Sequence, residues 1–340
     1  MIDCLVGKNH RPVPAMDWSR LVEQIRLHRL GPMVLRDLPD DVPRFVREQL
    51  TEQKKQAAFE ALRTLQERDT LLHALNSAQC QPIVLLKGAV TGWLVYPDPT
   101  LRPMTDLDVL VERSQAGAVA EVLREHGYSS IETHPTRAAS RERVYERLFA
   151  KTLVTDTVLQ AVDVHTSFAQ NHRYPIDYAA VLGRIVPFEQ GGASAFRLDD
   201  VDHLLHLAIH MARDQFMGSL RHLLDIHLWV TQRPPAWPMV IERATEWGAQ
   251  STLFMALQLT CEVFGTAVPE TALSVLDPGG LRSRFLRWWH RPTDERLIRW
   301  DVGIRIAQAM ALMPLMDKPI QRARFVGQYA WLRSRDVWTR

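Results

Sequence analysis

The sequence RPMTDLDVLV at residues 102–111 decides the fold of this chain. Asp106 and Asp108 stand two positions apart in an apolar run, and residues i and i+2 of a strand share one face. We therefore expect a strand that presents both carboxylates on one face and turns Leu107 and Val109 into a core. Carboxylates that lie this close repel each other unless a positive charge lies between them. A hard divalent cation such as Mg²⁺ meets this need, because it prefers carboxylate and phosphate oxygens.

A second signal, Lys87-Gly88, ends the short apolar run at residues 82–86. The pattern predicts a strand that turns into a helix, where glycine lets backbone N–H groups approach a phosphate. Lys87 can add a positive charge, Thr91 a hydroxyl and Arg102 the fork of a guanidinium. These four residues are our candidates for phosphate binding.

A third carboxylate, Asp163, lies between two valines in a later apolar run. Three carboxylates on neighbouring strands can hold one or two Mg²⁺ ions, with Mn²⁺ as the alternative. Each signal alone is weak, since an aspartate pair at a strand end is often only solvated. The order of the signals is more informative: strand, Lys-Gly turn, helix, Asp-x-Asp strand, helix, hairpin and single-Asp strand.

Helical patterns surround this segment on both sides. We expect an α+β fold with a small mixed sheet, flanked by N-terminal and C-terminal helical regions. The expected domains are a helical cap at residues 1–80, an α/β core at 81–172 and a helical domain at 173–340. A long amphipathic helix is predicted near residues 43–78, with Phe59 and Leu62 among its apolar positions.

Composition narrows the class of protein. The 340 residues are 46% apolar and 24% charged, as in a soluble globular protein. The three cysteines show no CxxC spacing, which argues against a thiolate zinc site and a disulfide scaffold and favours a reducing compartment. We see no signal peptide and no apolar run of the ~20 residues that a membrane helix needs. We therefore expect a cytoplasmic protein without a membrane partner.

Basic residues are concentrated near the C-terminus. Residues 281–340 contain 12 Arg and 1 Lys against 5 Asp and Glu. A solvated helical face explains this excess, and so does a surface for a polyanionic partner such as RNA. Trp288, Trp289 and Trp331 lie in the same region, where they can stack on a nucleic acid or pack between helices.

The motifs in this order resemble the nucleotidyltransferase superfamily of the DNA polymerase β type. More narrowly, they resemble an uncharacterised bacterial nucleotidyltransferase family whose members share LKG, YPDP, RPM and a D-x-D-x-LV strand. The matching residues are 86–88, 96–99, 102–104 and 106–111, with further likeness at 127–128 and 163–165. The resemblance covers roughly residues 17–230. One departure is Lys87-Gly88-Ala89, because the wider superfamily has Gly-Ser at this turn.

The resemblance implies an enzyme that attacks the α-phosphate of an NTP, transfers the NMP group and releases pyrophosphate. Asp106 and Asp108 would be Mg²⁺ ligands, and Asp163 a third ligand or the group that helps to deprotonate the acceptor. Catalysis would rest mainly on positioning and charge neutralisation. The acceptor is open: a small molecule, a peptide, a protein or RNA. Because the turn lacks serine, an inactive binding protein with a basic C-terminal partner surface is the alternative.

Histidines suggest a rival. His203, His206 and His210 follow one another at spacings that share a helix face, and His165, His222 and Asp225 lie near in sequence. A transition-metal hydrolase is a second alternative, although no glutamate completes an HExxH pattern and such histidines are more often structural. Within the nucleotidyltransferase hypothesis, we expect nucleotide or phosphate contacts from helical residues His206, His210, Arg221 and Asp225.

Overall fold

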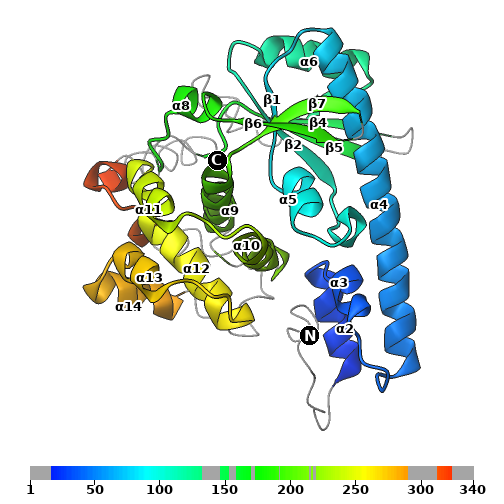
Figure 1. Cartoon of the computed structure of the whole chain (residues 1–340). Helices are drawn as coiled ribbons and strands as arrows, with labels where there is room; N and C mark the ends of the chain where they lie inside the picture. The colour runs from blue at the N-terminus through cyan, green and yellow to red at the C-terminus, as the bar shows by residue number, and fades with distance from the viewer. Residues whose placement is uncertain are drawn as a thin grey trace, which may run out of the picture. The chain divides into compact units, whose positions relative to one another are not determined.

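The computed structural model describes residues 17–131, 146–152, 158–169, 173–190, 192–213, 216, 220–289 and 312–323. The chain forms two compact units, coloured along the sequence in Figure 1. The first unit contains residues 1–168 and 178–199, and the second contains residues 169–177 and 200–340. None of the helices in the described ranges combines the length and apolar character needed to cross a membrane.

The first unit is built on one mixed sheet, as predicted. Its strands run in the order β3-β4-β5-β2-β1-β7-β6. β2 pairs in parallel with β5, and β1 pairs in parallel with β7, while the other neighbours are antiparallel. The strands are β1 Ile83–Leu85, β2 Asp106–Val111, β3 Ser129–Ile131, β4 Glu146–Thr152, β5 Val158–His165, β6 Val186–Gln190 and β7 Ala193–Arg197.

The sheet extends past the core that we expected to end at residue 172. β6 and β7 form a hairpin whose second strand pairs with β1, so residues 178–199 belong to the first unit instead of the C-terminal helical domain. Phe188 and Ala195 are buried partners in this hairpin. Pro187 lacks an N–H to donate, and it is tolerated because β6 is an edge strand.

The long helix predicted near residues 43–78 is confirmed as α4. Figure 1 shows it running from α2 and α3 to the sheet, and it contacts β2, β7 and α6. Phe59 and Leu62, which we counted among the apolar positions of this amphipathic helix, are 67% and 58% exposed and so do not belong to its buried face. The helix buries Ala57, Ala61 and Thr64 over the same turns, because small side chains let it approach its neighbours closely. Helices of this unit are α2 Trp18–Leu27, α3 Gly31–Arg36, α4 Arg44–Ser77, α5 Gly88–Leu94, α6 Ala116–Glu125, α8 Tyr178–Leu182 and the 3₁₀ turn η1 Pro99–Leu101.

The second unit is helical. α9 is buried along most of its length, and Trp229 of α10 stacks on His203 of α9 with ring centroids 4.0 Å apart. The Trp229 indole also donates a hydrogen bond to the carbonyl of Asp200, at 3.2 Å. The elements are α9 Asp200–Arg213, α10 Leu220–Gln232, α11 Trp237–Glu246, α12 Gln250–Phe264, α13 Glu270–Leu276, α14 Gly280–Trp289 and the 3₁₀ turn η2 Met313–Leu315.

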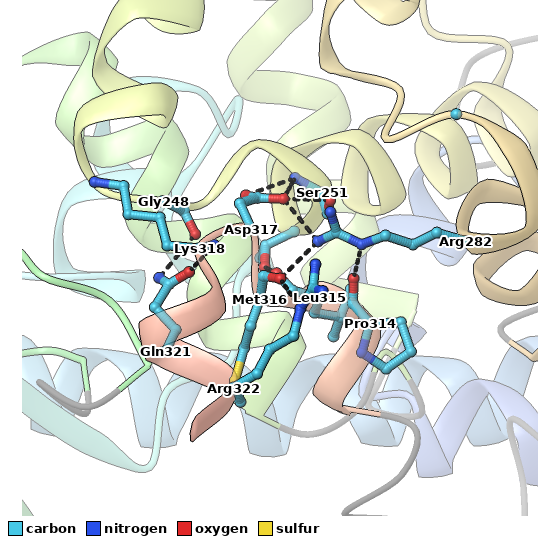
Figure 2. Close-up of polar contacts among 12 residues, drawn as sticks. Gly248, Ser251, Arg282, Pro314, Leu315, Met316, Asp317, Lys318, Gln321 and Arg322 are labelled. Carbon is cyan, nitrogen blue, oxygen red and sulfur yellow. Dashed lines mark hydrogen bonds and ion pairs between the residues drawn. The ribbon is translucent and has the colours of Figure 1, made fainter. Parts of the chain in front are cut away.

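Asp317 joins three parts of this helical unit, as Figure 2 shows. Its carboxylate accepts hydrogen bonds from the Ser251 hydroxyl at 2.5 Å and the Ser251 backbone N–H at 3.2 Å, at the start of α12. It also accepts a bond of 2.8 Å from the guanidinium of Arg282 in α14. Gln321 extends the network by donating to the carbonyl of Gly248 at 3.2 Å.

We expect Asp317→Ala to destabilise the protein by about 2–3 kcal/mol, because hydrogen bonds to a charged group are each worth about 1.5–3 kcal/mol and some are replaced by water. Chemical denaturation would measure the loss. Glu246→Ala is the matched control: its side chain is 58% exposed and its partner Arg243 also pairs with Asp202, so we expect it to lose about 1 kcal/mol or less. Equal losses in the two variants would show that Asp317 does not hold this network together.

The basic C-terminal region is partly described. Arg282 pairs with Asp317, and Arg287 pairs with Asp277, so these two arginines have acidic partners within the chain. Trp288 is 56% exposed. Trp331 and the side chain of Trp289 lie outside the described residues, and the predicted polyanion surface stays a prediction.

Candidate active site

The parallel pairing of β2 with β5 brings two aspartates together. The register places Asp108 directly beside Asp163, and Asp106 beside Ala161. Asp108 and Asp163 are both buried, at 5% and 9% exposure. Neighbouring strands lie about 4.8 Å apart, so the carboxylates of Asp108 and Asp163 are buried close to each other. The predicted convergence of carboxylates from separate strands is therefore present for this pair.

A histidine completes the group. His165 stands two residues after Asp163 on β5, and its Nε2 lies 2.9 Å from Oδ1 of Asp108. Asp108, Asp163 and His165 can each offer a ligand atom such that all three atoms lie within 4.8 Å of one another. We call these three residues the Asp-His cluster. Within the described ranges, it is the only group of three or more His, Cys, Asp or Glu side chains that meets this distance.

Asp106 stands apart from the cluster. It begins β2, is partly exposed, and does not belong to the group of close ligand atoms. Its place two residues before Asp108 still puts it on the same face of the strand. The Asp-x-Asp motif therefore supplies one buried member of the cluster and one side chain nearer to solvent.

Lys87 provides the positive charge next to Asp108. Its ammonium group forms a very short contact with the same Oδ1 that His165 approaches. Burial alone would raise the pKa of the Asp108 carboxyl, but the charge of Lys87 and the hydrogen bond and charge of His165 outweigh burial and hold this pKa well below its usual range. Asp108 is therefore a carboxylate.

The backbone at Lys87 is unusual. Its φ of +45° lies in a region that glycine tolerates better than lysine. Hydrogen bonds hold the turn: the Leu86 N–H donates to the Asp108 carbonyl at 3.0 Å, and the Thr91 hydroxyl donates to the Lys87 carbonyl at 2.8 Å. Strained backbone of this kind is often found at functional sites. The buried hydroxyl of Thr91 stabilises the turn, and its predicted contact with a phosphate stays a prediction.

Gly88 makes room for Arg102. A Cβ atom built on Gly88 would lie 1.9 Å from Nη1 of Arg102 and 3.0 Å from the sulfur of Met104. The guanidinium of Arg102, which is buried, therefore lies against the backbone of the Lys-Gly turn. This packing gives Gly88 a second role beside the predicted exposure of its N–H, and it brings two predicted phosphate-binding residues together.

We expect Gly88→Ala to destabilise the protein by about 1–3 kcal/mol, because the added methyl group must displace Arg102 from a packed site. Gly92→Ala is the matched control on the same helix, since its Cβ would meet Arg102 at an ordinary 3.7 Å. Alanine is favoured over glycine inside a helix by about 1 kcal/mol, so this control should be neutral or slightly stabilising. Thermal and chemical unfolding would measure both variants, and equal stability of the two would refute the close packing.

The histidines of α9 lie in the second unit. His203 stacks on Trp229, and His210 meets His222 edge to face with centroids 4.9 Å apart. Among the described residues, these histidines form no group of three close metal-ligating side chains, so the transition-metal centre considered for this helix is not found there. Because His203 stacks on the Trp229 ring, packing within the helical unit is enough to explain this histidine. The nucleotide contacts predicted for His206, His210, Arg221 and Asp225 stay predictions.

His165 is the member of the cluster to which sequence reasoning gave no role beside the aspartates. The signal was present, because the i, i+2 rule that joined Asp106 to Asp108 also joins Asp163 to His165. In the sequence alone, His165 groups equally well with the histidines of the later helix. The structure shows that it contacts Asp108 instead.

The sheet and the Asp-His cluster define the class: a mixed α/β protein with a buried Asp-Asp-His group that could hold a metal ion. A protein family described as "Uncharacterised nucleotidyltransferase" matches residues 14–265, and the chain belongs to this family. No curated protein matches the chain. A crystal structure of an antigenic nucleotidyltransferase-like protein from Paracoccidioides brasiliensis is similar at 14% identity and a TM-score of 0.37, over 60% of this chain and 93% of that chain.

Proposed function

We propose that this protein is a divalent-cation-dependent enzyme that transfers an NMP group from an NTP to an acceptor and releases pyrophosphate. The observation that carries the proposal is the pairing of Asp108 with Asp163 beside Lys87, in a chain of the nucleotidyltransferase family. The chemistry of the donor set fits a divalent cation, because carboxylates are buried together and one is ionised. When bound, such a cation neutralises charge on the triphosphate and orients it for in-line attack.

The roles of the residues follow from their positions. We assign Asp108 and Asp163 to cation binding, and Asp163 also to the acceptor side, where it would help to remove the proton of the attacking hydroxyl. We assign Asp106, which is nearer to solvent, to a further contact with the cation that accompanies the triphosphate. Lys87 and Arg102 would neutralise phosphate oxygens beside Gly88. Binding of these groups in fixed positions can supply much of the rate enhancement.

Labelled nucleotides test this function. The purified protein would be incubated with each NTP, labelled at the α- or the γ-phosphate, with Mg²⁺ or Mn²⁺ and with RNA, the protein itself or a small-molecule extract as acceptor. We expect the α-label to move to one acceptor while the γ-label leaves in pyrophosphate. Transfer of the γ-label to an acceptor would contradict the proposal, because it would indicate a kinase.

The alternative of a binding protein makes a different prediction in the same experiment. With Mg²⁺, no NTP would raise the melting temperature of the protein and no label would move to an acceptor, so a clear thermal shift with one NTP would count against this alternative. The motivating feature is the Lys87-Gly88-Ala89 turn, which has no hydroxyl after the glycine. The acceptor, the preferred NTP, the nucleic-acid partner and the cytoplasmic location stay predictions from the sequence.

A further inference from the structure

His165 makes the buried site different from a set of carboxylates alone. The residue is 2% exposed, its backbone pairs with Leu110 of β2 and Glu146 of β4, and its Nε2 lies 2.9 Å from Oδ1 of Asp108. Its ligand atom lies within 4.8 Å of those of both Asp108 and Asp163, whereas Asp106 is outside this group. The third position of the cluster is therefore held by an imidazole nitrogen instead of a third carboxylate oxygen.

The hydrogen bond to Asp108 fixes the tautomer of His165. An ionised carboxylate can only accept, so Nε2 of His165 carries the proton that it donates to Asp108 Oδ1. In the neutral ring, Nδ1 then holds a lone pair. Nδ1 is buried, and no described residue gives it a hydrogen-bond partner. Metal-ligating histidines commonly donate one ring N–H to a carboxylate and keep a lone pair on the other nitrogen, and His165 has this protonation pattern.

The distance between His165 and Asp108 also suits direct ligation through Nε2. Two neighbouring ligands of an octahedral cation, each about 2.1 Å from it, lie about 3 Å apart. Nε2 of His165 and Oδ1 of Asp108 are 2.9 Å apart. A cation bound at Nε2 would take the place of the shared proton, which the neutral ring would then carry on Nδ1, and the ammonium of Lys87 would leave the same oxygen; neither His165 nor Asp108 would need to move far.

We propose that an imidazole nitrogen of His165 is a ligand of the catalytic cation, together with Asp108 and Asp163. Imidazole is a good ligand for first-row transition cations and a poor one for Mg²⁺, which prefers oxygen. The site thus selects Mn²⁺ or Co²⁺ over Mg²⁺, with Co²⁺ bound more tightly than Mn²⁺ by the usual order of divalent affinities. This inference deepens the proposed function, because it names the metal class of the same site.

The test measures metal binding without nucleotide. Mn²⁺ would be titrated into the protein while electron paramagnetic resonance follows the free ion, and Mg²⁺ would compete for the site. We expect Mn²⁺ to bind at least about tenfold more tightly than Mg²⁺. His165→Asn should weaken Mn²⁺ binding at least about tenfold and change Mg²⁺ binding much less. His126→Asn is the matched control, since His126 caps the end of α6 outside the Asp-His cluster and its ring is hydrogen-bonded to the carbonyl of Val122.

A spectroscopic signature separates a ligand from a residue that only positions Asp108. Pulsed electron paramagnetic resonance of the Mn²⁺-loaded wild-type protein should show coupling to one ¹⁴N nucleus, which changes to ¹⁵N coupling after labelling of histidine. This readout needs no variant, so it decides the question even if His165→Asn fails to fold. Mn²⁺ binding without nitrogen coupling would overturn the inference, as would equal affinity for Mn²⁺ and Mg²⁺.

The two proposals fail in different ways. If no divalent cation binds, both the ligand role of His165 and the cation dependence of the enzyme are wrong. If Mn²⁺ binds with nitrogen coupling but no NTP supports transfer, the ligand role of His165 holds and the proposed reaction is wrong. If transfer requires Mg²⁺ and His165→Asn leaves metal affinity unchanged, the reaction holds and the ligand role is wrong.

Discussion

Replacing Asp108 with asparagine is expected to lower the rate of nucleotidyl transfer by about 10³-fold, the upper range for loss of one group that stabilises transition-state charge. The substitution keeps the shape of the side chain and removes its negative charge. It therefore leaves Lys87 without its closest carboxylate and takes one anionic ligand from the cation. Transfer of an α-labelled NMP group, measured at saturating NTP and metal, would give the rate.

Glu112→Gln is the matched control for this variant. Glu112 directly follows β2, is exposed, and lies at the opposite end of the strand from Asp106, so its change should leave the transfer rate within about twofold. Melting curves would show whether Asp108→Asn remains folded. A folded Asp108→Asn protein that keeps more than a tenth of the wild-type rate would exclude Asp108 from the catalytic site.

Lys87→Met should have the largest effect on stability in the absence of metal. Removing one member of a buried ion pair typically costs about 3–5 kcal/mol, because the remaining charge stays buried without compensation. The lysine and aspartate side chains of this pair are only 12% and 6% exposed, and His165 still donates to Asp108. We therefore expect a loss of about 3 kcal/mol in EDTA, measured by chemical denaturation.

A divalent cation should restore part of this loss, because cation and lysine compensate the same carboxylate. Saturating Mn²⁺ would raise the free energy of unfolding of Lys87→Met more than that of the wild-type protein. Lys151→Met is the matched control, since Lys151 pairs with Glu67 at a more exposed position and should lose about 1 kcal/mol or less. If Mn²⁺ stabilised both proteins equally, Lys87 and the cation would not share Asp108.

The central part of the fold could be predicted because its signals are local. Short apolar runs bounded by turn-forming residues mark three elements: the Lys-Gly turn, the Asp-x-Asp strand and the later Asp163 strand. The structure confirms their order. The hairpin at residues 186–197 was missed. Its alternation around Gly191-Gly192 is a hairpin signal, and Pro187 fits its first strand because β6 lies at the edge of the sheet.

The candidate site could be predicted only in part, for a similar reason. A sequence shows that Asp106 and Asp108 share a face, but it does not show at which residue the strand becomes buried. That depends on the neighbouring strand β5, whose Asp163 pairs with Asp108. The same limit explains Phe59 and Leu62, whose exposure depends on which turns of α4 meet the sheet. The contact of Arg102 with Gly88 joins residues 14 positions apart through packing, and no local pattern encodes it.

The ladder between β2 and β5 also constrains how this protein can change during evolution. Side chains alternate along a strand, so inserting or deleting one residue within β5 would bring a valine beside Asp108 and turn Asp163 to the opposite face. Connecting loops can change length at a small entropic penalty. We therefore expect length differences among active relatives to fall outside residues 106–111 and 158–165, and a relative that breaks this rule to have lost its chemistry.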